Sequence, residues 1–225
     1  MSKRRAVVFD LDGTLIDSAP LWPEVDQAFF TMLLGPDGWE RWQPIWLAMR
    51  ASGIQNYDPA IFARLIGEFS RTETLNELTH ARESFLCRVY RAQLQPMRGA
   101  HEIIRHFSHQ GTPVAIASGM SIFVIQRVVE QFGWSYAITA MASTHEVGKN
   151  KPEPDVYLLA ARRLHADPTE CLAVENELKG YDSAVRAGML CAFVPDSARC
   201  REEAKARLPS SAMHSSLLDV LAAHG

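Results

Sequence analysis

Two aspartates, Asp10 and Asp12, stand one residue apart directly after the apolar run AVVF at positions 6–9, and Gly13 follows at once. A short continuous apolar run is typical of a strand that is buried on both faces in a parallel sheet. Acids at the end of such a strand serve most often as turn or capping residues. Whether these two aspartates have a chemical function therefore depends on which residues follow the other predicted strands.

Unusual residues also follow the other predicted strands. Ser118 ends the run PVAIA at positions 113–117, and Glu175 with Asn176 ends the run CLAV at positions 171–174. Lys151 lies in the loop before a predicted helix. Because the carboxyl ends of parallel strands share one edge of the sheet, we expect these side chains to lie together.

Phosphoryl transfer would use such a set. An ionised carboxylate can attack phosphorus and form an acyl phosphate, which divides one difficult displacement into two easier steps. Like charge opposes the attack by about 4 kcal/mol per unit pair at roughly 4 Å and an effective dielectric near 20. A lysine and Mg²⁺, which prefers oxygen ligands and substrate phosphate, would offset this repulsion. A second carboxyl group could exchange the proton, and Gly13 would let backbone N–H groups reach phosphate oxygens.

The rest of the chain alternates strands with helices, which predicts a parallel sheet with right-handed crossovers. We expect strands at 6–9, 113–117, 136–140, 171–174 and 190–194 and helices at 100–110, 122–132, 154–164 and 181–187, with a closing helix near the end. The segment from about 19 to 92 differs, because helical spacing dominates and four of the five tryptophans lie there. Gly35-Pro36 and Pro44 are expected to interrupt it into about four helices.

The fold class predicted is therefore α/β: a Rossmann-like three-layer parallel-sheet core with an inserted small α-helical cap domain. The core is assigned to residues 1–16 plus 92–225 and the cap to 17–91. An insertion directly after the first strand is expected to shield the ligand edge of the sheet.

Composition limits the functions that fit. The 225 residues carry a formal net charge of -3, which provides no basic field for nucleic acid or anionic lipid. No segment approaches the roughly 20 apolar residues of a membrane span. Four cysteines without a zinc-like spacing are typical of reduced thiols, so a cytoplasmic protein is expected. Its partner would be a small phosphorylated metabolite, and it would act as a monomer or homodimer.

Four segments in order resemble the motifs of the haloacid dehalogenase superfamily. They are DLDGTLIDS from Asp10, IASGMS ending at Ser121, KPEPDVYL from Lys151 and VENELKGYDSAVRAGM ending at Met189. The last is similar to an ED-S-x-x-G run followed by a helix ending in AGM. The resemblance implies a Rossmann-like core with an α-helical C1 cap, and the style of the fourth motif is closest to the β-phosphoglucomutase-like and sugar-phosphate phosphatase branch.

The resemblance also implies roles, position by position. Asp10 would be the nucleophile and a metal ligand, and Asp12 the general acid and base, with its backbone carbonyl on the Mg²⁺. Glu175 and Asn176 would complete the metal site. The following residues would bind the transferring phosphoryl group: Gly13, Thr14, Ser118, Gly119 and Lys151.

Some residues depart from the pattern. Asn176 stands where many relatives have Asp, so it offers a carbonyl oxygen without charge, and weaker metal binding is expected. Asp12 argues against a dehalogenase, because a halide leaving group needs no proton. Trp22 and Ser121 replace the His and Lys of relatives that are phosphomutases, which favours a hydrolase. DSAPLW at 17–22 is similar to a segment of 2-deoxyglucose-6-phosphatase-like enzymes, with Ala19 in place of Glu.

The resulting prediction is a Mg²⁺-dependent phosphatase acting through an aspartyl-phosphate. The alternatives are a phosphomutase of the β-phosphoglucomutase type and a catalytically impaired binding protein with the same fold. Cap residues that could contact substrate are Trp22, Trp39, Trp42, Trp46, Arg50 and Arg64, although the tryptophans could equally form the cap core and the arginines could be solvated.

Overall fold

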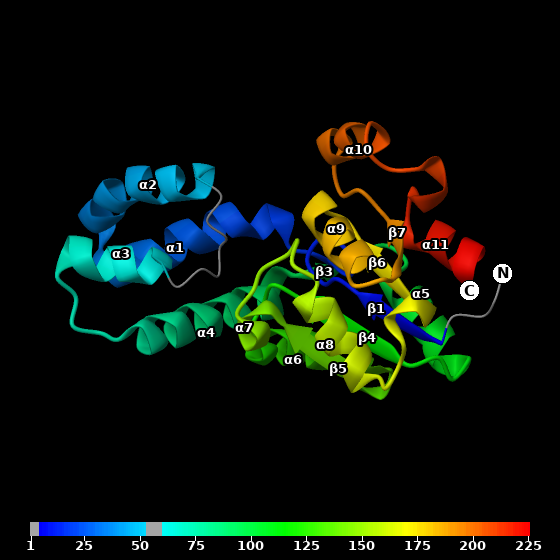
Figure 1. The fold of residues 1–225 in the computed structure, drawn as a ribbon. Coiled ribbons are helices and arrows are strands. Elements are labelled where there is room, and N and C mark those ends of the chain that lie inside the picture. Colours follow the sequence, from blue (N-terminus) through cyan, green and yellow to red (C-terminus); the bar gives the residue numbers. More distant parts are fainter. Residues whose placement is uncertain (1–4, 53–59) are drawn as a thin grey trace. The chain divides into compact units, whose positions relative to one another are not determined.

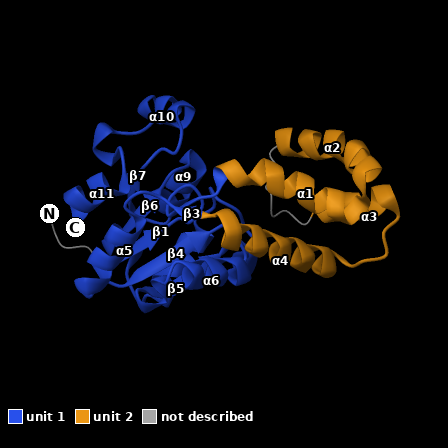
Figure 2. Ribbon diagram, turned by 180° about the vertical axis from the view of Figure 1, so that it is seen from behind, with its two compact units in different colours: residues 1–19, 95–225 blue, residues 20–94 orange. Residues whose placement is uncertain are grey.

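The computed structural model describes residues 5–52 and 60–225 and divides the chain into two compact units. One unit comprises the chain up to Ala19 and from Gln95 onward, and the other comprises Pro20–Leu94 (Figures 1 and 2). The sequence places the corresponding limits at residues 17 and 91.

The larger unit is built on a five-stranded parallel sheet in the order β5-β4-β1-β6-β7 (Figure 1). Its strands are β1 (Ala6–Phe9), β4 (Val114–Ser118), β5 (Ile138–Ser143), β6 (Cys171–Glu175) and β7 (Leu190–Phe193). A two-stranded antiparallel pair, β2 (Ile16–Asp17) with β3 (Gln95–Pro96), lies beside the points where the chain leaves and re-enters this unit.

Helices cover both faces of the sheet. The helices of this unit are α5 (Ala100–His109), α6 (Ile122–Gln131), α7 (Thr144–Val147), α8 (Asp155–Arg163), α9 (Leu178–Arg186), α10 (Ala198–Lys205) and α11 (Leu217–His224). Short 3-10 turns occupy Ala19–Leu21, Trp134–Tyr136, Pro168–Glu170 and Ser210–Ala212. The Rossmann-like α/β core predicted from the sequence is thus confirmed. Among the described residues, no helix is both long and apolar enough to cross a membrane.

The two faces of β1 pack differently. Ala6 and Val8 share a buried cluster with Ala115, Ala117 and small residues of the other strands, and α8 and α9 pack on this face. Small side chains let the helices approach the sheet closely. On the opposite face, the Phe9 ring contacts Phe107 of α5 with centroids 6.5 Å apart.

The smaller unit is helical throughout the part that the structure describes. It contains α1 (Trp22–Leu34), α2 (Pro36–Ala51), α3 (Ala60–Phe69) and α4 (Leu75–Gln93), and α4 begins with a capping box of Thr74 and Glu77. Its core gathers aromatic rings: Phe30 contacts Trp39, Trp42 and Trp46 at centroid distances of 6.1, 5.6 and 6.2 Å. These three tryptophans therefore form part of the core of the smaller unit, which was the alternative to a role in substrate contact.

Several element boundaries differ from those expected. Pro44 does not interrupt a helix but lies inside α2. Trp42 and Trp46, two positions before and after it, are both buried. Their burial outweighs the hydrogen bond that the proline removes. β5 begins at Ile138, after the 3-10 turn, and continues to Ser143, beyond the expected end at 140. The strands β2 and β3 and the helices α7 and α10 were not predicted.

Candidate active site

The sheet topology places the chemically active residues of three strands side by side. β1 is the central strand, and β4 and β6 flank it with Phe9 opposite both Ile116 and Val174. Asp10, Ser118 and Glu175 therefore stand at the carboxyl ends of three adjacent strands. All three are buried, with exposed fractions of 6%, 1% and 1%.

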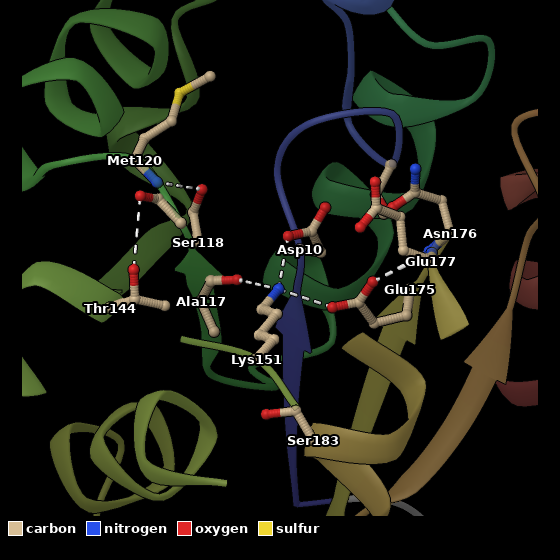
Figure 3. Close-up of polar contacts among 12 residues, drawn as sticks. Asp10, Ala117, Ser118, Met120, Thr144, Lys151, Glu175, Asn176, Glu177 and Ser183 are labelled. Carbon is tan, nitrogen blue, oxygen red and sulfur yellow. Dashed lines mark hydrogen bonds and ion pairs between the residues drawn. The ribbon is translucent and has the colours of Figure 1, made fainter. Parts of the chain in front are cut away.

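Lys151 joins these strand ends. Its Nζ donates hydrogen bonds to Asp10 Oδ1 and Glu175 Oε1, both at 2.6 Å, and to the carbonyl oxygen of Ala117 at 3.0 Å (Figure 3). The ammonium thus contacts β1, β4 and β6 at once, although it comes from the loop before α8. One cation between two carboxylates is the most prominent electrostatic feature of the site.

Burial and neighbouring charge change the ionisation of this group. Burial lowers the pKa of Lys151, but the nearby Asp10 and Glu175 carboxylates outweigh it and the net pKa is raised. Lys151 therefore remains an ammonium ion at any ordinary pH. Burial also raises the pKa of Asp10 well above its usual value; Lys151 opposes the rise, and the Glu175 carboxylate adds to it. The ionised form of Asp10 consequently depends on nearby positive charge.

Glu175 is held by four donors. Its Oε1 accepts from Lys151 Nζ and from Tyr157 Oη, both at 2.6 Å. Its Oε2 accepts from the backbone N–H of Asn176 at 3.1 Å and of Glu177 at 3.5 Å. Both oxygens are therefore engaged by protein groups, and the carboxylate is fixed against Lys151.

The end of β4 leads into a turn that presents Ser118 and Gly119. Ser118 Oγ accepts from the backbone N–H of Met120 at 3.1 Å. Ser143 donates to the Met120 carbonyl at 2.6 Å, and Thr144 donates to the Gly119 carbonyl at 3.5 Å (Figure 3 shows Thr144). Residues at the end of β5 thus fix the turn that follows β4.

The loop after β1 is bonded to the end of β6. Thr14 Oγ1 donates to Asn176 Oδ1 at 3.2 Å, and Asn176 Nδ2 donates to Asp196 Oδ2 at 2.9 Å. Gly13 has a φ of +75°, and a Cβ there would lie 2.2 Å from Asn176 Nδ2. Glycine is required at this position for both reasons. Asp12 accepts a hydrogen bond from Ser18 Oγ.

The structure thus brings most of the predicted residues into contact. Asp10, Lys151 and Glu175 form one cluster, and Gly13, Thr14 and Asn176 form a second beside it, whereas Ser118 is bonded to its own turn. Three further residues of the site were not predicted from the sequence: Ser143, Tyr157 and Asp196. Ser143 follows the same strand-end pattern as Ser118 and was missed because its strand was expected to end at residue 140.

A Rossmann-like sheet that gathers acids, a lysine and a serine at its carboxyl edge is typical of an α/β enzyme whose ligand site lies at the strand ends. The chain belongs to the haloacid dehalogenase-like hydrolase family, whose model matches residues 4–188. Hexitol phosphatase B of Escherichia coli (strain K12) is 30% identical over 191 residues, which cover 84% of this chain and 83% of that protein.

Two further comparisons agree with this assignment. The bifunctional riboflavin kinase/FMN phosphatase of Arabidopsis thaliana is 36% identical over 104 residues, 46% of this chain, and the match spans only 27% of that longer protein. The crystal structure of CbbY from Rhodobacter sphaeroides in complex with phosphate has a similar fold, with a TM-score of 0.71, 19% identity and 96% of each chain covered. The family and its phosphatase relatives identify the protein as an enzyme of the phosphoric monoester hydrolase type.

Proposed function

We propose that this enzyme is a Mg²⁺-dependent phosphatase that hydrolyses a small phosphorylated metabolite through an aspartyl-phosphate on Asp10. The observation that carries the proposal is the contact of Lys151 with both Asp10 and Glu175 at 2.6 Å. An ammonium in this position lowers the repulsion between a carboxylate nucleophile and a phosphate dianion. The same contact orients Oδ1 of Asp10 and leaves its second carboxylate oxygen for attack.

The first step transfers the phosphoryl group to Asp10. A carboxylate oxygen of Asp10 forms a bond to phosphorus while the bond from phosphorus to the ester oxygen breaks. The electron pair stays on the leaving oxygen, which takes a proton from the Asp12 carboxyl group. Asp12 is suited to this role because its carboxylate lies in the same loop and is oriented by Ser18.

The second step releases phosphate. Asp12, now ionised, takes a proton from a water molecule as the water oxygen bonds to phosphorus. The bond from phosphorus to Asp10 breaks, and the carboxylate and the protonated Asp12 are restored. Lys151, Ser118 and the backbone N–H of Gly119 are proposed to hold the phosphoryl oxygens in both steps. The backbone N–H groups of Gly13 and Thr14, expected from the sequence to take part, instead donate within their own loop to the carbonyls of Ile16 at 2.8 Å and Leu11 at 3.3 Å.

The donor set fits Mg²⁺ bound with few protein charges. Among the described residues, no three His, Cys, Asp or Glu side chains are grouped to hold a metal ion. Mg²⁺ is commonly bound by one or two carboxylates, waters and substrate phosphate. Asp10, the Asp12 backbone carbonyl and the Asn176 amide oxygen provide such donors. When bound, the ion would neutralise charge on the transferring group.

Glu175 is assigned a different part in this proposal. Its two oxygens already accept four hydrogen bonds, so it fits the role of fixing Lys151 better than the ligand role implied by family resemblance. Asn176 then becomes the side-chain ligand that the fourth motif provides. The site would hold Mg²⁺ with fewer negative charges than one that has Asp at position 176.

The names of the relatives support a proposal for the substrate class. Hexitol phosphatase B, by its name, acts on a phosphorylated sugar alcohol, and we propose a polyol or sugar phosphate of similar size for this chain. The phosphomutase alternative predicts that an isomer of the sugar phosphate accumulates. The impaired binding protein predicts no turnover with or without Mg²⁺.

The test is phosphate release from a panel of polyol, sugar and nucleotide monophosphates, with p-nitrophenyl phosphate as a general substrate. Asp10→Asn should lower the rate by roughly 10⁴-fold or more, as is typical when a nucleophile is removed. Asp167→Asn is the matched control, because Asp167 lies ahead of β6, at the other end of the strand from Glu175. Wild-type rates in Asp10→Asn would exclude aspartyl-phosphate chemistry.

A further inference from the structure

Asn176 has a hydrogen-bond partner for every polar group. Its backbone N–H donates to Glu175 Oε2, and its backbone carbonyl accepts from Cys200 Sγ at 3.2 Å. Its side chain lies between Thr14 and Asp196, and the residue is only 2% exposed. The neutral amide is therefore fixed through its side chain and its backbone.

Only one of the two side-chain partners can define which way the amide faces. The Thr14 hydroxyl can donate or accept, so it accommodates either orientation. A carboxylate only accepts, so Asp196 requires the Nδ2 group of Asn176 to face it. The carbonyl oxygen of Asn176 then faces the Thr14 hydroxyl, which belongs to the loop after β1.

The position of Asp196 is itself defined by the sheet. The backbone N–H of Val194 donates to the Glu175 carbonyl at 2.7 Å, which continues the pairing of β6 with β7 to the start of the loop. Asp196 stands two residues further on. Gly13 provides the space, because a Cβ at residue 13 would lie 2.2 Å from Asn176 Nδ2 and 3.1 Å from Asp196 Oδ2.

We propose that Asp196 is a positioning residue that orients the Asn176 amide, so that a carbonyl oxygen and not an NH₂ group faces the cation site. The inference rests on the magnesium site of the proposed function. One lone pair of Asn176 Oδ1 accepts from Thr14, and the second would be available to a bound cation. Asp196, in the loop after β7, also provides a negative charge next to position 176, where the neutral Asn176 provides none.

The decisive experiment is a double-mutant cycle read by calorimetric titration with MgCl₂, in the absence of substrate. Asp196→Ala should weaken Mg²⁺ binding by about tenfold or more, the usual effect of removing a group that orients a metal ligand. Asp196→Asn retains one acceptor and should give a smaller loss. Glu202→Ala, on the exposed face of α10 nearby, is the control for removal of one negative charge.

The second arm repeats the substitution in an Asn176→Asp background. A carboxylate at 176 has no orientation to select and is repelled by Asp196, so Asp196→Ala should there leave Mg²⁺ binding unchanged or tighter. Thermal unfolding without Mg²⁺ checks that each variant is folded. If Asp196 positions the amide, Asp196→Ala weakens Mg²⁺ binding when residue 176 is Asn and does not weaken it when residue 176 is Asp. If Asp196 acts only by attracting the cation at long range, the substitution weakens Mg²⁺ binding in both cases.

Three results would overturn the inference. Unchanged Mg²⁺ binding in Asp196→Ala would show that the amide does not need this partner. An equal loss in both backgrounds would assign Asp196 to long-range attraction alone. Absence of Mg²⁺ binding to the wild-type protein would overturn the magnesium part of the proposed function and this inference with it, whereas the first two results leave that function intact.

Discussion

Tyr157 connects α8 to the charged centre of the site. Its hydroxyl donates to Glu175 Oε1 at 2.6 Å, and the Lys151 Nζ lies 5.1 Å from the centre of its ring. Burial raises the pKa of Tyr157 well above its usual value, and the Glu175 carboxylate raises it further. The hydroxyl is therefore always protonated and acts as a permanent donor that limits the movement of Glu175.

Tyr157→Phe keeps the ring beside Lys151 and removes only the donor. We expect a loss of about 1–3 kcal/mol in the free energy of unfolding, the usual contribution of a hydrogen bond to a charged group. Phosphate release should fall about tenfold in kcat with little change in KM, because Lys151 loses a fixed partner and not its charge. Steady-state kinetics and denaturant unfolding are the measurements. Tyr181→Phe is the control, and equal behaviour of the two variants would refute a role for Tyr157.

At the level of single residues, the sequence predicted that Asp10, Ser118 and Glu175 stand at one edge of the sheet, because parallel strands end there. Lys151 reaches Asp10 and Glu175 from the loop before α8. Tyr157 could not be predicted in this way. It lies within an amphipathic helix, where an aromatic residue is expected in the core, and only the packing of α8 against the sheet brings its hydroxyl to Glu175. Asp196 was not predicted because it lies three positions after the end of β7, and only residues directly at strand ends were considered.

The beginning of α9 is shaped by its contact with Glu175. Gly180 is the third residue of this helix, and a Cβ there would lie 1.9 Å from Glu175 Oε1 and 2.2 Å from Oε2. The helix can therefore approach the carboxylate only without a side chain at this position. This gives a physical reason for the glycine of the fourth motif, five residues after Glu175.

Gly180→Ala should displace the Glu175 carboxylate from Lys151. We expect phosphate release to fall by about a hundredfold or more, because a displacement near 1 Å at a reacting centre has effects of that size. Gly67→Ala is the matched control: Gly67 is also helical, and a Cβ there would have nothing within 4 Å. That variant should be equally active and more stable by about 0.5–1 kcal/mol. Wild-type activity in Gly180→Ala would show that Glu175 tolerates displacement.

Helices and strands were predicted where the spacing of apolar residues was clear. They were missed where contacts between distant parts of the chain determine the secondary structure. The strands of the sheet core are continuous apolar runs, so their existence followed from the sequence. β2 and β3 have two residues each. Their pairs, Ile16 with Pro96 and Asp17 with Gln95, join residues that are 80 and 78 positions apart, and no local pattern signals such pairing. The misplaced start of β5 has a similar cause, because Tyr136 belongs to the 3-10 turn with the buried Trp134.

On the scale of the whole molecule, the residues proposed for catalysis all belong to the larger unit. The smaller unit has its own core of aromatic rings, and it also contains a buried ion pair between α1 and α4. Arg82 donates to Asp26, and each side chain is only 6% exposed. The Arg82 guanidinium also lies 5.7 Å from the centre of the Trp22 ring. The helical spacing predicted the aromatic core but not this pair, because two charges that are 56 positions apart give no local signal.

Removal of one partner tests whether the smaller unit is stabilised by this pair. Asp26→Asn leaves the Arg82 charge buried without its carboxylate, a change that typically costs about 3–5 kcal/mol. We expect faster amide hydrogen exchange in α1 and α4, because these helices join through the pair, and unchanged exchange in β1, β4 and β6, whose contacts lie in the other unit. Glu40→Gln, an exposed position on α2, is the control and should leave both units unchanged. Faster exchange throughout the chain in Asp26→Asn would show instead that the two units unfold as one, and unchanged exchange in α1 would show that the pair contributes no stability.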